Sequence, residues 1–163
     1  MEVHLRPMTP EADAAMTLSG RIESAMRDAM RARDEQRTQT LRMAMAAAQN
    51  LRIERRRDLT DEEVVDVLSR QVKQRRESIA MYRDAGHEDR AAAEEAEAAI
   101  LAEFLPEQLS EADVERLVRD AIAETGAVSP ADLGRVMGRL SPRTKGRADG
   151  RLVSDVVRRL LAG

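Results

Sequence analysis

The apolar residues of this chain recur at helical spacing. In the clearest case, Val114, Leu117, Val118, Ala121 and Ile122 follow the pattern i, i+3, i+4, i+7, i+8, which places them on one face of an α-helix. Runs of β-branched and aromatic residues of strand length are absent, and aromatic residues make up only 1% of the sequence. Hydrophobic residues make up 42%, so an aliphatic core is available. We therefore expect an all-α protein.

Capping and breaking residues delimit four helices in the N-terminal part. Thr60, followed three residues later by Glu63, forms the pattern of a capping box, and Gly86 is suited to end the helix that follows. The expected helices span about residues 19–33, 34–55, 60–84 and 87–104. In the fourth of these, the small and apolar residues expected to face inward are Ala92, Ala96, Ala99 and Ile100.

A proline-containing segment, Leu105–Leu109, separates these helices from a shorter set. Pro106 stops a helix, and Ser110 can cap the next with Asp113 three residues on. Three helices are expected beyond it, with a second start at Ser129-Pro130. The sequence thus predicts an N-terminal bundle of long helices, residues 19–105, and a C-terminal three-helix domain, residues 110–163.

Residues 1–18 are predicted to be an N-terminal extension. Thr9-Pro10-Glu11 has the pattern of a helix start, with a cap, a proline in the first position and an acidic first turn. A short helix, an expression leader and a mobile N-terminus remain open interpretations.

A basic segment from Leu140 to Leu152 lies between two helical patterns and is predicted to be a loop. It combines four cations with residues that break or bend helices. Its glycines would let the backbone approach a ligand, and its cations favour an anion such as a phosphate backbone. A solvated loop whose glycines only turn the chain is the alternative. The residues concerned are Arg143, Lys145, Arg147, Arg151, Pro142, Gly146 and Gly150.

Charge is distributed unevenly along the chain. Residues 84–115 contain eleven acidic residues and one basic residue, whereas residues 130–163 contain eight basic and three acidic residues. This indicates a polar molecule with a cationic end, to which Arg135 and Arg139 can contribute. Because aromatic side chains are scarce, structured RNA is favoured over single strands, which are usually bound by base stacking.

Other chemistry has little support in the sequence. Absence of cysteine excludes disulfides, thiolate metal sites and a cysteine nucleophile. No motif indicates a cofactor, so none is expected. Ser141 and Lys145 have the spacing of a Ser–Lys dyad, but both belong to the predicted loop. No apolar run approaches the roughly 18 residues needed to span a bilayer, and no secretory signal is evident, so we expect a cytoplasmic protein without membrane contact.

Three motifs resemble those of the YqeY proteins: Leu105–Ser110 (LPEQLS), Gly134–Met137 (GRVM) and Lys145–Gly150 (KGRADG). The N-terminal half agrees at Thr40–Met43 and Leu68–Arg75. The resemblance covers about residues 19–163. It implies a helical bundle joined to a three-helix domain similar to the tail of the GatB subunit of the tRNA-dependent amidotransferase.

The resemblance also implies a function. The tail of GatB is understood to contact tRNA rather than to catalyse, so the matched positions Lys145, Gly146, Arg147 and Gly150 would belong to a tRNA-facing loop. Arg143 and Arg151 are added on electrostatic grounds. The family label of carbon–nitrogen ligase with glutamine as amido-N-donor is expected to describe the larger enzyme.

Three hypotheses follow. The first is a non-catalytic tRNA-binding accessory module whose partner is an amidotransferase or an aminoacyl-tRNA synthetase. The second is a protein-interaction module whose acidic fourth helix, with Glu94, Glu95 and Glu97, docks a basic partner. The third is a component of a glutamine-dependent carbon–nitrogen ligase.

Overall fold

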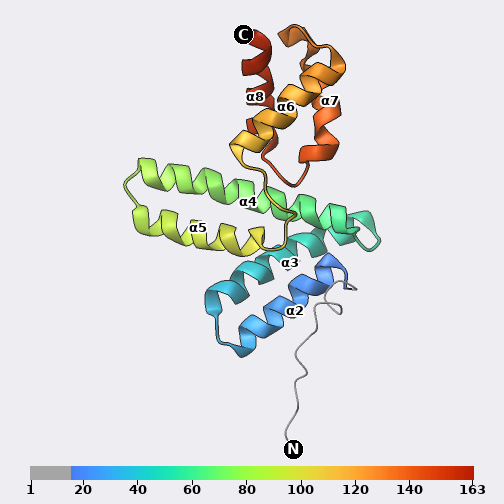
Figure 1. The fold of residues 1–163 in the computed structure, drawn as a ribbon. Helices are drawn as coiled ribbons and strands as arrows, with labels where there is room; N and C mark the ends of the chain where they lie inside the picture. Colours follow the sequence, from blue (N-terminus) through green and yellow to red (C-terminus); the bar gives the residue numbers. More distant parts are fainter. Residues whose placement is uncertain (1–15) are drawn as a thin grey trace, which may run out of the picture. The chain divides into compact units, whose positions relative to one another are not determined.

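The computed structural model describes residues 16–163, and all regular structure in this range is helical (Figure 1). The predicted fold class, an all-α chain with an N-terminal bundle and a C-terminal three-helix domain, is confirmed. The described residues form two compact units, which divide between Phe104 and Leu105. The helix start predicted at Thr9-Pro10-Glu11 lies outside the described residues.

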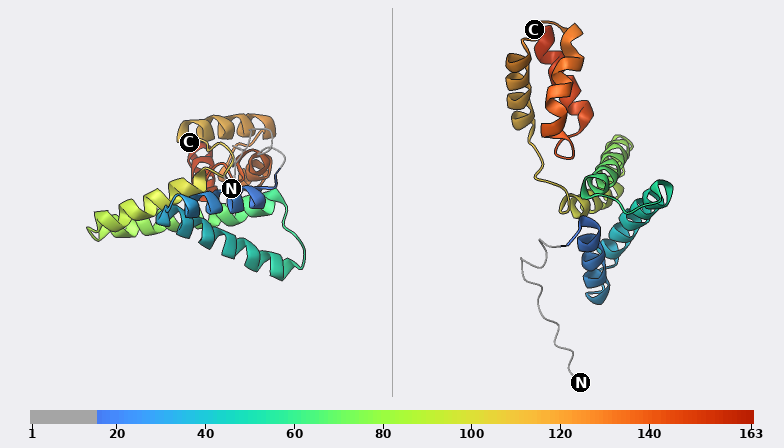
Figure 2. Two further views of the ribbon diagram at one scale, coloured as in Figure 1. Left: turned by 90° about the horizontal axis from the view of Figure 1, so that it is seen from below. Right: turned by 90° about the vertical axis from the view of Figure 1, so that its right-hand side faces the viewer.

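The first unit contains four helices: α2 (Leu18–Arg31), α3 (Glu35–Arg55), α4 (Asp61–Asp84) and α5 (Glu88–Ala102). Figures 1 and 2 show two helical hairpins, in which α2 packs mainly against α3 and α4 mainly against α5. The core between them is aliphatic apart from one phenylalanine. Its most buried large side chains are Leu41, Val64, Leu68 and Leu101.

Helix caps in this unit follow the sequence pattern. The side-chain oxygen of Thr60 accepts from the backbone N–H of Glu63, and the Glu63 carboxylate accepts from the backbone N–H of Thr60. A hydrogen bond from Arg57 lowers the pKa of Glu63 to about 2. The backbone N–H of Leu18 donates to Oδ1 of Asp61 at 3.0 Å, so the starts of α2 and α4 are held together.

The inward face predicted for α5 is partly wrong, although Ala96 and Ile100 are half-buried. Ala92 and Ala99 are exposed, and the buried residues are Ala91 and Leu101. Because alanine occurs all round this helix, its apolar stripe is poorly defined in sequence, and packing against α4 selects the face.

One cation of α4 is buried. Arg75 is 7% exposed, and its Nε donates to Oε2 of Glu97 on α5 at 3.2 Å. Its Nη1 also donates to the backbone oxygen of Gln71 at 3.4 Å. The basic run that interrupts the apolar side of α4 in sequence thus includes one residue of the core.

The second unit contains α6 (Glu111–Thr125), the short 3-10 helix η1 (Pro130–Asp132), α7 (Leu133–Thr144) and α8 (Gly150–Ala162). The three α-helices pack around one cluster of buried aliphatic residues. Fully buried members include Val114, Val118, Val136, Leu140 and Val157. Ser110 and Asp113 form the expected capping box at the start of α6.

The predicted loop Leu140–Leu152 is much shorter in the structure. Helix α7 continues through Pro142 to Thr144, and α8 begins at Gly150, which leaves only Lys145–Asp149 between them. The helix accommodates Pro142 because this residue lies in its last turn. In the same turn, the buried hydroxyl of Thr144 donates to the carbonyl oxygen of Leu140 at 3.1 Å. Ser141 is also helical, and its hydroxyl donates to the carbonyl oxygen of Met137.

Candidate nucleic-acid interface in the C-terminal unit

The connection Lys145–Asp149 is a compact turn with a defined backbone. Gly146 has φ +74°, a conformation in which a side chain is disfavoured. The backbone N–H groups of Arg147 and Ala148 both donate to the carbonyl oxygen of Thr144, at 2.9 and 3.0 Å. Asp149 then caps α8 by accepting from the backbone N–H of Arg151 at 2.8 Å.

The segment that precedes α6 holds this turn in place. Nε2 of Gln108 donates to the carbonyl oxygens of Gly146 and Pro106, at 2.8 and 2.7 Å. The backbone N–H of Leu109 donates to the carbonyl oxygen of Arg147 at 2.8 Å. Two of the motifs singled out in the sequence therefore contact each other.

Arg147 contributes to the same attachment. Its Nε donates to the carbonyl oxygen of Glu107 at 3.2 Å, and its Nη1 donates to the carbonyl oxygen of Arg143 at 3.3 Å. Its guanidinium therefore bridges the segment before α6 and the end of α7. Since two of its donors are engaged with backbone carbonyls, Arg147 has a structural role in addition to any contact with a ligand.

The arginines of α7 have carboxylate partners. Nε of Arg139 lies 2.8 Å from Oε2 of Glu124, and Nη2 of Arg143 lies 3.2 Å from Oε1 of the same residue. These hydrogen bonds, from Arg139 first and then Arg143, lower the pKa of Glu124. Arg135 pairs with Asp132 at 3.2 Å. The pKa of Asp132 is lowered chiefly by its hydrogen bonds from the backbone N–H groups of Val128 and Ser129.

These pairs reduce the charge asymmetry seen along the sequence. Over residues 105–163 there are ten Lys and Arg residues and nine Asp and Glu residues, so the second unit carries a formal charge of +1. The excess counted from residue 130 onward omitted Glu124 and other carboxylates of α6. The cationic character of this unit is therefore local rather than general.

Two cations at the turn are exposed to solvent. Lys145 precedes Gly146, and Arg151 lies in the first turn of α8. Within the described residues, the Arg151 side chain makes no ion pair. A Cβ at Gly150 would meet no atom within 4 Å, so this glycine is not required by packing. The structure thus brings Lys145, Gly146, Arg147, Gly150 and Arg151 together, whereas Arg135, Arg139 and Arg143 lie on α7.

Sequence reasoning did not identify Gln108 and Glu124 as parts of this region. Gln108 belongs to a motif that had been noted, but only the fold shows what it contacts. Glu124 lies 15 and 19 residues from its partners, and no periodic pattern connects residues at those separations.

Two further features concern the described residues only. No group of three or more His, Asp or Glu residues is placed to hold a metal ion there. None of the described helices combines the length and apolar character that crossing a bilayer requires. The acidic residues of α5 that were predicted to dock a basic partner are partly engaged within the chain. Glu95 pairs with Arg83, and Glu97 pairs with Arg75.

The chain resembles known proteins over most of its length. It is 28% identical over 146 residues to a protein of Pyrenophora tritici-repentis (strain Pt-1C-BFP) named "Altered inheritance of mitochondria protein 41, mitochondrial". The similarity covers 86% of this chain and 79% of that relative. A family model described as Yqey-like protein matches residues 19–161. The chain therefore belongs to the YqeY-like family.

Proposed function

We propose that the C-terminal unit binds the phosphate backbone of tRNA through the turn Lys145–Asp149 and the first turn of α8. The chain would then act as a non-catalytic accessory module. The observation that carries this proposal is that two exposed cations, Lys145 and Arg151, flank a turn held by Gln108 and Leu109. A pre-organised turn loses little conformational entropy on binding, and the N-terminus of a helix favours negative charge.

The ion pairs limit how many phosphate contacts are expected. Arg139 and Arg143 share Glu124, and Arg147 donates to two carbonyl oxygens. We assign the main phosphate contacts to Lys145 and Arg151, because both residues are exposed on either side of the turn. Gly146, with φ +74°, shapes the backbone between them. The resemblance to the tail of GatB supports tRNA as the polyanion and an amidotransferase or aminoacyl-tRNA synthetase as the partner.

Binding of bulk tRNA over a series of salt concentrations tests the proposal. A Lys145→Gln/Arg151→Gln variant should bind more weakly, and its log–log salt slope should be flatter by about two units or slightly less. An Arg116→Gln/Arg119→Gln variant is the matched control, because it makes the same change in net charge on α6. Equal effects of the two variants, or no binding of tRNA by the wild-type protein at low salt, would overturn the proposal.

A role in amidotransfer is a separate proposal with a separate assay. The family label of carbon–nitrogen ligase predicts ammonia release from glutamine, which an enzymatic ammonia assay measures directly. The expected result for this chain alone is no release above the rate without protein. A cytoplasmic location is likewise proposed, and fractionation of cells that express the protein tests it.

Docking of a basic partner on α5 has less support. Glu95 and Glu97 already have arginine partners within the chain, so a basic partner would have to displace them. A pull-down that depends on Glu94 and Glu95, and not on Lys145 and Arg151, would favour this alternative.

A further inference from the structure

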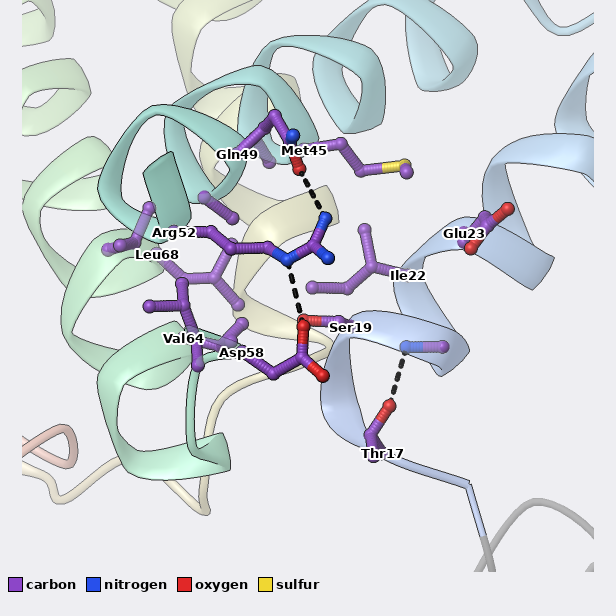
Figure 3. A pocket seen from close by; sticks show the side chains of 15 residues that line it. Thr17, Ser19, Ile22, Glu23, Met45, Gln49, Arg52, Asp58, Val64 and Leu68 are labelled. Carbon is purple, nitrogen blue, oxygen red and sulfur yellow. Dashed lines mark hydrogen bonds and ion pairs between the residues drawn. The ribbon is translucent and has the colours of Figure 1, made fainter. Parts of the chain in front are cut away.

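The first unit contains a pocket that takes no part in the proposed tRNA contact. It lies between α2, α3 and the start of α4 and has a volume of about 350 Å³ (Figure 3). Its wall is mostly apolar, and the residues that define it are Ile22, Ala44, Met45, Ala48, Val64 and Leu68. Protein interiors normally leave few spaces larger than a water molecule. A volume of this size falls at the lower end of the range for small-molecule sites.

The pocket exists because small residues occupy the facing helices. Gly20 on α2, and Ala44 and Ala48 on α3, all line it. Where larger side chains would fill the space between two helices, these residues leave it open. We call this space the bundle pocket.

A second hollow adjoins the bundle pocket at the end of α3. It has a volume of about 390 Å³ and is lined by arginines 52, 56 and 57 with Ile53 and Asp58. We call it the arginine hollow. Arg57 pairs with Glu63 at 2.7 Å, whereas Arg56 makes no ion pair within the described part of the chain. Ile53 is 63% exposed.

Arg52 and Asp58 form the boundary between the two spaces. Both residues, with Gln49, line the bundle pocket and the arginine hollow alike. Nε of Arg52 donates to Oδ1 of Asp58 at 2.8 Å, and Figure 3 shows this pair beside the apolar wall. The apolar wall of the bundle pocket and the arginines of the arginine hollow therefore meet at the Arg52–Asp58 pair.

The backbone also places Arg56 at the hollow. Arg56 is the C-terminal cap of α3 and has φ +56°, which is uncommon for a residue other than glycine, asparagine or aspartate. Arginines at the end of a helix stabilise its dipole. That effect explains the cations, but it explains neither the apolar pocket beside them nor the exposure of Ile53.

We propose that the bundle pocket and the arginine hollow together bind a small amphipathic anion, a single aliphatic chain with a carboxylate or phosphate head group. The aliphatic chain lies in the bundle pocket against Met45 and Ala48. The head group lies in the arginine hollow, where the side chain of Arg56 donates to its oxygens. This site is independent of the proposed tRNA contact, because it belongs to the other unit of the chain.

Titration with decanoate, followed by ¹³C-methyl spectra of methionine, tests the site. The Met45 signal should shift on addition of decanoate, and the signal of Met81, which is 71% exposed on α4, should not. Decanol should bind about tenfold more weakly, because it lacks the charge-assisted hydrogen bonds. Inorganic phosphate alone should leave the Met45 signal unchanged.

Two variants separate the two halves of the site. Ala48→Leu fills the bundle pocket and should reduce decanoate affinity at least about tenfold. Ala46→Leu, on an exposed position of the same helix, is the matched control and should bind as the wild type does. Arg56→Gln should bring the affinity for decanoate down to that for decanol, while Arg76→Gln, an exposed arginine outside both hollows, should have no effect.

The outcomes that would overturn the proposal are equally specific. They are wild-type affinity in Ala48→Leu, equal binding of decanol and decanoate by the wild-type protein, or no shift of Met45 in the folded wild-type protein. If Ala48→Leu does not fold, as judged by far-UV circular dichroism, the Arg56→Gln comparison decides alone. Retention of the preference for decanoate in that variant would then refute the site.

Discussion

Gln108 and Gly146 are joined by a hydrogen bond of 2.8 Å across 38 residues of sequence. The donor is the side-chain amide of Gln108, and the acceptor is a backbone carbonyl in the turn that precedes α8. Because Leu109 donates to the neighbouring carbonyl of Arg147, the two contacts together form a short backbone clamp. The turn is therefore held from outside its own sequence.

Substitution of Gln108 should loosen this clamp. In a Gln108→Ala variant, the amide of Leu109 should exchange its hydrogen about five- to tenfold faster, since a net contribution of about 1 kcal/mol is removed from the attachment. Hydrogen exchange followed by NMR measures this rate. A Gln74→Ala variant, on the exposed face of α4, is the control and should leave the exchange of Leu109 unchanged. Unaltered exchange in Gln108→Ala would show that the side chain does not hold the turn.

Two glycines of the second unit should respond to alanine in opposite directions. Gly146→Ala should lower the free energy of unfolding by about 1 kcal/mol, because φ of +74° disfavours a side chain. Gly138→Ala should raise it by about 0.5–1 kcal/mol, because Gly138 lies inside α7 and a Cβ there meets nothing within 4 Å. Urea unfolding followed by the methyl signal of Met137, the only methionine of residues 105–163, reports on this unit. The same sign for both variants would contradict the backbone argument.

Glu124 should make the second unit sensitive to acid. Its pKa is lowered in the folded state by Arg139 and Arg143, so the unfolded chain binds the proton more readily. The stabilisation is therefore complete above the unfolded pKa of about 4.5 and is lost as pH falls through the lower folded value. Glu124→Gln should lower the melting temperature at pH 7, and the difference from wild type should shrink toward pH 3.

The control for this effect is Glu111→Gln, which removes a carboxylate that makes no ion pair among the described residues. It should leave the acid dependence of melting unchanged. A constant difference between Glu124→Gln and wild type from pH 7 to pH 3 would indicate that the residue acts by packing alone.

The buried arginine of the first unit predicts a non-additive pair of substitutions. Glu97→Gln leaves the charge of Arg75 in the core without its carboxylate and should destabilise the unit by about 1–2 kcal/mol, less than for a fully buried pair because Glu97 is 31% exposed. The double variant Arg75→Met/Glu97→Gln should recover part of this loss, since methionine fills the space without a charge. Urea unfolding followed by the methyl signal of Met45 measures both. A double variant less stable than Glu97→Gln would contradict this account.

Local signals in the sequence predicted most of the fold. The capping box of Thr60 and Glu63 and that of Ser110 and Asp113 are both formed, because each depends on residues only three apart. The aliphatic stripe of α6 faces the core as its spacing indicates. These features require nothing beyond one turn of helix.

Features that depend on tertiary contacts were not predictable in this way. The continuation of α7 through Pro142 depends on a final turn closed by the buried hydroxyl of Thr144, and burial at that position follows from the packing of three helices. On α5, the abundance of alanine left the buried face undefined until α4 was placed against it.

The candidate tRNA site was only half accessible to sequence reasoning. The cations and glycines of the turn could be identified from residue type, and their grouping followed from proximity along the chain. The carboxylate that neutralises Arg139 and Arg143 could not be identified from the sequence, because Glu124 belongs to another helix. Sequence counts of charge therefore overestimate how much of it is available to a ligand.

Glu124 also acts as a tethered competitor for any anion that approaches α7. Because the carboxylate belongs to the same chain, its local concentration near Arg139 and Arg143 does not fall on dilution. A single small anion must displace it unaided, whereas a polymer anchored elsewhere brings its next phosphate at a comparably high local concentration. If α7 also contacts tRNA, its arginines would therefore bind a multivalent ligand in preference to a single small anion.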